Sequence, residues 1–260
     1  MGLQYMVERQ KNISRLYRLA GFFGLSDYEP TSHMHSKKAI QSLGRDLNYP
    51  FSSYTICRGF VNLGVELKDR LATFDTVLSD DAGGRLVSLV MGKLINFQRE
   101  ALNLPPSRVF FLASSVNTKA HAEIEAFLAS RRSEIGNALV CTQFVDSGTT
   151  IDMLSDIIDR LGIRYTLAIL EDGTVFSFQR DKKGHKYKSA HSGVIYVSKL
   201  REMTKFMDNP SLTGVYTIKD QLDPFPKKAQ SENVSQSVTK TRADLEVFTA
   251  RLAKAIGIKL

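Results

Sequence analysis

Cysteine is scarce in this sequence: Cys57 and Cys141 are the only two among 260 residues. Two cysteines make no disulfide framework, and the apolar run around Cys141 predicts a buried, reduced thiol. Cysteine and histidine do not occur at the spacing of a zinc site, and His33 and His35 merely alternate within a polar stretch. We therefore predict no structural disulfide and no metal site.

Long apolar runs are also missing. No run approaches the ~20 residues that a membrane-spanning helix needs, and the first residues lack the pattern of a signal peptide. These absences predict a cytoplasmic protein without a membrane partner. The sequence has no internal repeat or low-complexity tract, and its 260 residues suffice for one sizeable core with an appendage.

The sequence does carry an excess of positive charge, with a formal net charge of +8. Such an excess favours anionic ligands, which include nucleotides, phosphorylated sugars and nucleic acid. The same excess also serves solubility alone. Charge by itself therefore does not choose among these classes.

Strand and helix patterns alternate in the middle of the chain. Short apolar runs with strand character stand at residues 74–79, 108–114, 138–141 and 165–170, and helical patterns stand between them at residues 86–100, 119–132 and 151–161. This alternation predicts βαβ units and hence an α/β fold, in which a parallel sheet carries helices on both faces. Ligands of such sheets bind at the carboxyl ends of the strands.

The segments on either side of this core have other patterns. We expect an N-terminal helical segment at residues 1–70, the α/β core at 71–172, a β-rich antiparallel flap with a return to the core at 173–221, a polar linker at 222–240 and a C-terminal helix at 241–260. The flap includes a basic stretch, residues 180–188, which is either a solvated hairpin tip or a contact for an anionic ligand or nucleic acid. The final helix either covers the core or mediates oligomerisation, so a homodimer stays open.

A turn of small residues follows the strand predicted at residues 138–141. It reads Asp146-Ser147-Gly148-Thr149-Thr150 and leads directly into an amphipathic helix. Gly148 lets the backbone approach a ligand, the hydroxyl groups donate hydrogen bonds, and the N-terminus of the helix favours an anion. The turn is therefore a candidate phosphate-binding loop. The alternative is a plain strand-to-helix turn in which Asp146 only caps the helix.

A second glycine turn supports the first. Asp81, Ala82, Gly83, Gly84 and Arg85 stand between the strand predicted at residues 74–79 and the next helix, with the arginine at the helix start. Two such loops in one sheet would hold a ligand with two separate phosphate groups.

The stretch at residues 138–151 resembles the motif with which type I phosphoribosyltransferases bind phosphoribosyl pyrophosphate (PRPP). That motif is an apolar strand, two acidic residues, two apolar residues and then Asp-Thr-Gly-x-Thr before a helix. Phe144 and Val145 match the apolar pair, and residues 146–150 match the phosphate loop. The resemblance implies a phosphoribosyltransferase-like fold over roughly residues 70–172.

The resemblance also implies roles for individual residues. Residues 146–150 would wrap the 5′-phosphate of a phosphoribosyl group, Arg85 and its loop would take the pyrophosphate, and Asp146 would act as a base or as an electrostatic partner of the incoming base. The family's acidic pair binds the ribose hydroxyls, and here Thr142 and Gln143 stand at those positions. Both side chains can hydrogen-bond a diol without supplying charge, so Mg²⁺ is compatible with PRPP but is not required for binding.

Three functions remain open from the sequence. The first is an enzyme, a pentosyltransferase that moves a phosphoribosyl group between PRPP and a base by positioning the reactants and stabilising the leaving group. The second is a catalytically inactive nucleotide-sensing or regulatory module, which the missing acidic pair favours. The third is a nucleic-acid-binding protein, which ranks last because the sequence contains no recognition motif and no aromatic-rich platform.

A rival resemblance concerns the same turn. Asp-x-Gly-Thr-Thr is similar to the phosphate loop of the superfamily that joins actin, the heat-shock chaperone ATPases and the sugar kinases. There the motif turns between two antiparallel strands, whereas here a helix is predicted directly after it. The sequence therefore favours the phosphoribosyltransferase resemblance.

Overall fold

The computed structural model describes residues 36–79, 83–112, 118–145, 149–172, 196–197, 209–216, 227–228 and 231–260. Residues 40–260 form one compact unit. The helices are α2 (Lys37–Leu43), α3 (Tyr54–Leu67), the 3-10 helix η2 (Lys68–Thr73), α4 (Arg85–Ala101), α5 (Thr118–Ser130), α6 (Arg132–Ile135), α7 (Thr149–Arg160), α9 (Pro210–Thr213) and α10 (Glu232–Ala255). The strands are β1 (Thr76–Ser79), β2 (Arg108–Phe111), β3 (Asn137–Val145), β4 (Arg164–Asp172), β5 (Tyr196–Val197), β6 (Val215–Tyr216) and β7 (Lys227–Lys228).

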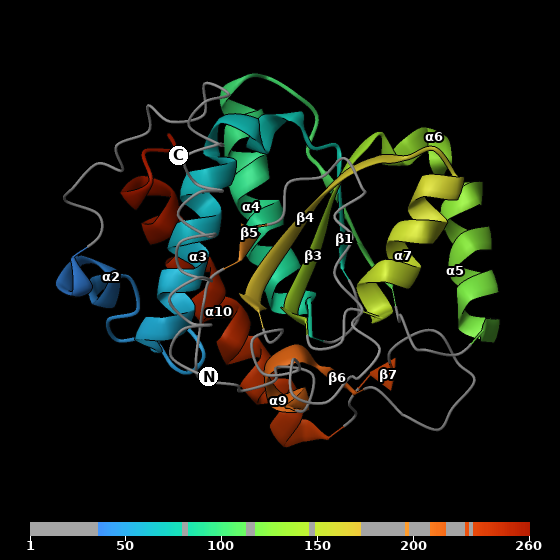
Figure 1. Cartoon of the computed structure of the whole chain (residues 1–260). Coiled ribbons are helices and arrows are strands. Elements are labelled where there is room, and N and C mark those ends of the chain that lie inside the picture. Colours follow the sequence, from blue (N-terminus) through green and yellow to red (C-terminus); the bar gives the residue numbers. More distant parts are fainter. Residues whose placement is uncertain are drawn as a thin grey trace, which may run out of the picture. The chain divides into compact units, whose positions relative to one another are not determined.

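Five strands form one parallel sheet in the order β2-β1-β3-β4-β5 (Figure 1). The strand order reverses at β1, because β2 lies on one side of it and β3 to β5 lie on the other. β6 and β7 pair antiparallel as a separate ribbon. The predicted α/β fold with a parallel sheet is confirmed.

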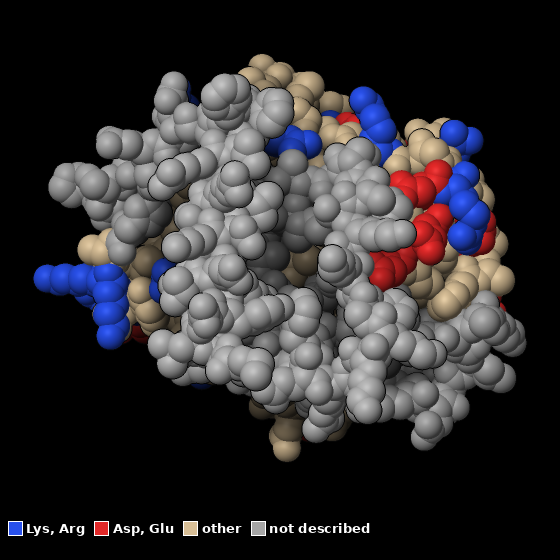
Figure 2. Space-filling model, in the orientation of Figure 1, with Lys and Arg blue, Asp and Glu red and all other residues tan. Residues whose placement is uncertain are grey.

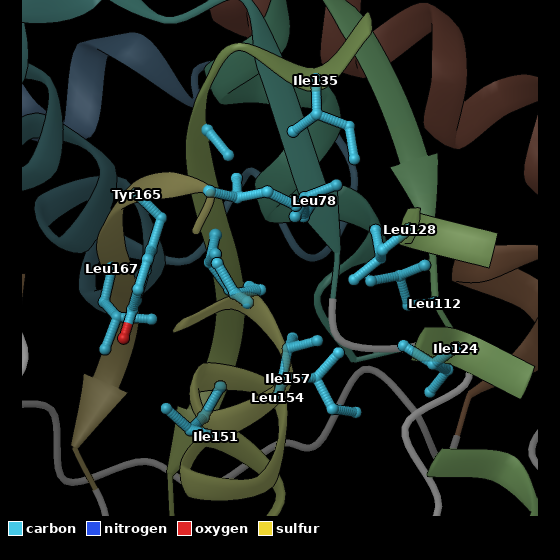
Figure 3. Close-up of a cluster of buried hydrophobic side chains, with 14 of the residues drawn as sticks. Leu78, Leu112, Ile124, Leu128, Ile135, Ile151, Leu154, Ile157, Tyr165 and Leu167 are labelled. Carbon is cyan, nitrogen blue, oxygen red and sulfur yellow. The ribbon is translucent and has the colours of Figure 1, made fainter. Parts of the chain in front are cut away.

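Helices cover both faces of this sheet. In Figure 1, α5 and α7 lie on one side of the sheet, and α3, α4 and α10 lie on the other. Strand alternation explains the division, since Val77 and Val109 approach Gly92 of α4 while Leu78 and Leu112 point into the opposite core. That second core is the cluster drawn in Figure 3, and its members include Ile124, Leu128, Ile151, Leu154, Ile157 and Ile158.

Segments outside the predicted core pack onto the same unit. Phe51, which precedes α3, stacks on Phe248 of α10 with ring centroids 4.9 Å apart, and Phe60 of α3 meets Phe248 edge-on at 5.4 Å. The side chain of Asp244 accepts hydrogen bonds from the backbone N–H and the amide group of Asn48. The boundary that we expected at residue 71, between the N-terminal helical segment and the α/β core, therefore lies inside one packed unit.

Two predictions outside the core need correction. The polar linker expected at residues 222–240 is wrong for residues 232–240, because α10 begins at Glu232. Ser231 caps this helix by accepting a hydrogen bond from the N–H of Val234, and Val234 and Val238 supply a sparse apolar stripe that composition alone did not reveal.

Residues 196–197 are also not part of an antiparallel flap. They form β5, which pairs in parallel with β4 inside the main sheet. The connection from β4 to β5 is longer than the dozen or so residues that a parallel crossover needs. The basic stretch of the predicted flap lies outside the described residues, as do residues 1–35 of the predicted N-terminal helical segment.

A buried arginine joins the start of β1 to the end of α4. Nη1 of Arg99 donates to the carbonyl oxygens of Ala72 and Phe74 at 3.0 and 2.9 Å and to Oδ1 of Asp75 at 3.2 Å. The Arg99 side chain is only 9% exposed. A buried charge is tolerated only where hydrogen bonds replace its water, and these acceptors provide them.

We expect Arg99→Met to lower the free energy of unfolding by about 2–5 kcal/mol, because it leaves buried carbonyl groups without a donor. The matched control is Arg108→Met, since Arg108 forms an ion pair with Glu134 while its side chain is 54% exposed. Exposed pairs contribute about 0–1 kcal/mol. Urea unfolding of the two variants checks the difference, and equal losses would contradict the role given to Arg99.

A buried thiol in α3 makes the protein less stable as the pH rises through the alkaline range. Burial raises the pKa of Cys57 to about 12, and the thiol donates to the carbonyl oxygen of Phe51 at 2.9 Å. An unfolded cysteine ionises near pH 8.5. Because the folded pKa is the higher one, this stabilisation is complete below about pH 8.5 and is lost as pH rises towards 12.

We therefore expect the free energy of unfolding of the wild type to fall more steeply with pH than that of Cys57→Ala. Between about pH 9 and 11 the excess slope is about 1.4 kcal/mol per pH unit, the value for one proton. Urea unfolding at several pH values measures both slopes, and all other titrating groups cancel in the comparison. If the free energies of unfolding of the wild type and Cys57→Ala changed in parallel with pH, the Cys57 thiol would not be shielded from water.

Candidate functional site

The two candidate loops leave neighbouring strands at one edge of the sheet. β1 is followed by the glycine turn and α4, and β3 is followed by residues 146–148 and α7. β1 and β3 are hydrogen-bonded partners, so the two strands run about 5 Å apart and both loops leave the same edge of the sheet. They also flank the point where the strand order reverses, which is where open parallel sheets bind their ligands.

β3 extends well past β1 at this edge. β1 ends at Ser79, opposite Cys141, whereas β3 continues beside β4 as far as the pair Val145 and Asp172. Four residues of strand correspond to about 13 Å. The carboxyl edge therefore has a step, with the end of β1 and the start of α4 at its base and the paired β3 and β4 as its wall. The strand predicted at residues 138–141 was too short for this step to be foreseen.

Thr142 and Gln143, the predicted ribose-binding pair, lie in the extended part of β3. Each is only 2% exposed. Successive side chains of a strand point to opposite faces, so Thr142 lies on the α7 side beside Ile169 and Gln143 lies on the α4 side. The structure places both residues at the predicted edge but does not bring their side chains together on one face.

The arginine of the second loop lies towards β2. Arg85 is the first residue of α4, and its Cζ lies 4.0 Å from the ring centroid of Phe111, the last residue of β2. β2 and β3 are two strand spacings apart, or roughly 10 Å. The cation and the turn after β3 thus occupy opposite sides of the end of β1. Phe111 was not predicted as part of the site, although two consecutive phenylalanines at the end of a strand were visible in the sequence.

The remaining predicted site residues are described only in part. Thr149 and Thr150 form the first turn of α7, and Gly83 and Gly84 directly precede α4. Ile151 is buried in the core cluster and anchors the start of α7 against the sheet. Asp81, Ala82, Asp146, Ser147 and Gly148 lie outside the described residues.

The outer face of α7 is acidic. Asp152, Asp156 and Asp159 are exposed along it, and Figure 2 shows acidic side chains gathered on this side of the molecule, next to basic ones. Arg160 pairs with Glu125 of α5 at 2.8 Å, and this hydrogen bond lowers the pKa of Glu125. The helix N-terminus favours an anion, whereas the carboxylates on the outer face of the same helix disfavour one.

Two further observations bear on the alternatives. β3 leads into a helix and pairs in parallel with both of its neighbours, so this part of the structure does not contain the antiparallel hairpin of the actin-like phosphate loop, the rival that the sequence already disfavoured. Within the described ranges, no three histidine, cysteine, aspartate or glutamate side chains are grouped to hold a metal ion. None of the helices described here combines the length and apolar character needed to cross a bilayer.

The burial of the pair on β3 generates a prediction. Replacing Thr142 and Gln143 by aspartates would introduce the charge that the PRPP-binding motif carries at these positions but would bury two carboxylates. We expect the double variant to lose about 3–5 kcal/mol of unfolding free energy at pH 7 for each carboxylate left unpaired.

The pH dependence of that loss tests its cause. Burial raises the pKa of a carboxyl group, so the deficit should be small near pH 4 and should grow as pH rises. Thermal unfolding across this range compares the double variant with Thr142→Val, which keeps the site neutral. A double variant as stable as the wild type at pH 7 would mean that the site accommodates charge.

The chain matches no protein-family model, no curated protein and no solved structure. Its function is therefore argued from the residues and the geometry described above.

Proposed function

We propose that this protein binds a phosphorylated ribose, either PRPP or a ribonucleotide, at the carboxyl edge beside β1 and β3. The ligand's 5′-phosphate lies in the turn formed by residues 146–150. The observation that carries the proposal is the strand order, which puts two loops with phosphate-binding composition at adjacent strand ends where the order reverses.

The start of α7 supports the phosphate position. This helix has 12 residues, enough turns for aligned peptide dipoles to favour an anion at its N-terminus. The turn before it supplies a glycine for close backbone approach and hydroxyl groups as donors. The resemblance to the PRPP-binding motif rests on the same residues.

The place of Arg85 supports a ligand with a second anionic group. Its guanidinium lies beside the end of β2, two strand spacings to one side of β3, and the end of β3 stands four residues further along the strand direction. A ribose with a phosphate at one end and a pyrophosphate at the other carries two separate anionic groups, one for each side of β1. PRPP therefore fits the site better than a free phosphate does.

The buried neutral pair favours binding over transfer. Thr142 and Gln143 supply hydrogen-bonding groups without charge, so the ribose hydroxyls and Mg²⁺ lack the carboxylates that the family's motif provides. We propose ligand sensing as the primary activity. The pentosyltransferase, with Asp146 as base and Arg85 on the leaving pyrophosphate, is the second candidate, favoured by the same pairing of loops. Nucleic-acid binding fits less well, because the acidic outer face of α7 repels a polyanion beside the site.

We expect Gly148→Val to abolish the thermal stabilisation given by ribose phosphate, nucleoside monophosphates or PRPP, because the new side chain blocks the approach of the phosphate. Thr149→Val should weaken binding about ten- to hundredfold, the value of one hydrogen bond to a charged group. The matched control is Thr118→Val, which changes the first residue of α5 as Thr149→Val changes that of α7. Equal effects of the two threonine variants would place the phosphate elsewhere.

The two candidate activities are separated by an assay for pyrophosphate release from PRPP with a panel of bases, with and without Mg²⁺. If the protein is a sensor, we expect PRPP to bind with little dependence on Mg²⁺ and no pyrophosphate to be released. Robust Mg²⁺-dependent turnover by the wild type would establish the transferase instead.

A further inference from the structure

Arg85 and Phe111 come from different elements and meet at the carboxyl edge. Arg85 opens α4, and Phe111 closes β2, where it is paired with Ser79. The distance of 4.0 Å from Cζ to the ring centroid is that of a guanidinium lying against the face of the ring, a cation–π contact. The contact links the loop after β1 to the neighbouring strand.

A guanidinium held in this way keeps its capacity to bind an anion. Its five N–H donors lie in its own plane, so an aromatic ring against its face takes up none of them. Contact with the ring also restricts the rotamers of a long side chain, which lowers the ordering cost when an anion binds.

The opposite face of β2 offers a natural comparison. Phe110 points towards α5 and packs edge-on against Phe127, with ring centroids 5.6 Å apart. Phe111 shares the α4 side with Val109, whose side chain approaches Gly92. Both phenylalanines are half-buried. They differ in the partner of the ring, which is another aromatic ring for Phe110 and a cation for Phe111.

We propose that Phe111 is a positioning residue that fixes the Arg85 guanidinium over the ends of β1 and β2, where it binds the second phosphate or pyrophosphate group of the ligand. This role rests on the proposed function, because it concerns the same ligand. Phe111 acts through Arg85, and its ring offers the ligand no hydrogen bond.

The test measures the affinity for inorganic pyrophosphate by calorimetry at a temperature where every variant is folded. Phe111→Leu should weaken binding about three- to thirtyfold, since it removes the cation–π contact, and Phe111→Tyr should restore it. Phe110→Leu should lower the melting temperature and leave the affinity unchanged.

A double-mutant cycle shows whether Phe111 acts through the arginine. Arg85→Gln should weaken pyrophosphate binding, and adding Phe111→Leu to Arg85→Gln should cost nothing further. An equal loss in both backgrounds, an equal loss for Phe110→Leu, or full affinity in Arg85→Gln would each overturn the role. If Phe111→Leu does not fold, Arg85→Lys provides the readout, because it keeps the charge and loses the planar fork. Full affinity in Arg85→Lys would then overturn the role.

Binding of ribose phosphate is measured in parallel to separate this role from the proposed function. Unchanged pyrophosphate affinity in Phe111→Leu, with ribose phosphate still bound, would reject the positioning role alone. A wild type that binds neither anion would reject both.

Discussion

The hydrogen bonds of Asp75 fix the register of three strands at the amino edge of the sheet. Its backbone N–H donates to the carbonyl oxygen of Asn137 at the start of β3, and its carbonyl oxygen accepts from the N–H of Arg108 at the start of β2. Its Oδ2 accepts from the N–H of Asn137, and its Oδ1 accepts from Arg99 at the end of α4. Because parallel strands share their direction, a register set at one edge also determines which residues meet at the other. α4 spans about 21 Å between Arg99 and Arg85. The anchor at Asp75 thus places the start of α4, and with it Arg85, at the carboxyl edge.

Much of this architecture was predictable because it follows from periodicity. Apolar runs and helical spacing located the strands and helices of the core, since burial on two faces of a parallel sheet imposes those patterns. The errors occurred where burial is weak or polar. β3 continues through Thr142 and Gln143, whose polar side chains hid the strand, and α10 begins at Glu232, where Val234 and Val238 are the only partly buried residues before Thr241. The composition of a segment indicates how buried such a segment is on average. The end of β3 is more buried than its polar residues suggest, and the start of α10 is helical although few of its residues are buried.

The sequence predicted that the two candidate loops share the carboxyl edge of one sheet, but it did not show that their strands are neighbours there. The turn at residues 146–150 and the glycine turn before Arg85 could be recognised from local chemistry. Their adjacency depends on β1 lying between β2 and β3, which is a long-range property that no local pattern encodes. The contact between Arg85 and Phe111 has the same character, because it joins residues on different elements through the pairing of β1 with β2. Likewise, the placement of the Thr142 and Gln143 side chains on opposite faces of the sheet follows only once both residues are known to belong to β3.

These features together determine what the edge can recognise. Hydrogen bonds to a charged group contribute about 1.5–3 kcal/mol each, against about 1 kcal/mol for a neutral pair. Under the proposed function, a helix N-terminus on one side of β1 and a guanidinium stacked on Phe111 on the other would direct most of the binding energy to two anionic groups. The sugar between the two anionic groups would contact neutral side chains. The affinity would therefore depend more on the spacing of the phosphates than on the sugar or on any metal ion bound to it. The acidic outer face of α7 opposes extended polyanions. The balance of charges that supports the proposal of a small bisphosphorylated ligand is thus also the reason why a nucleic-acid backbone would fit this edge less well.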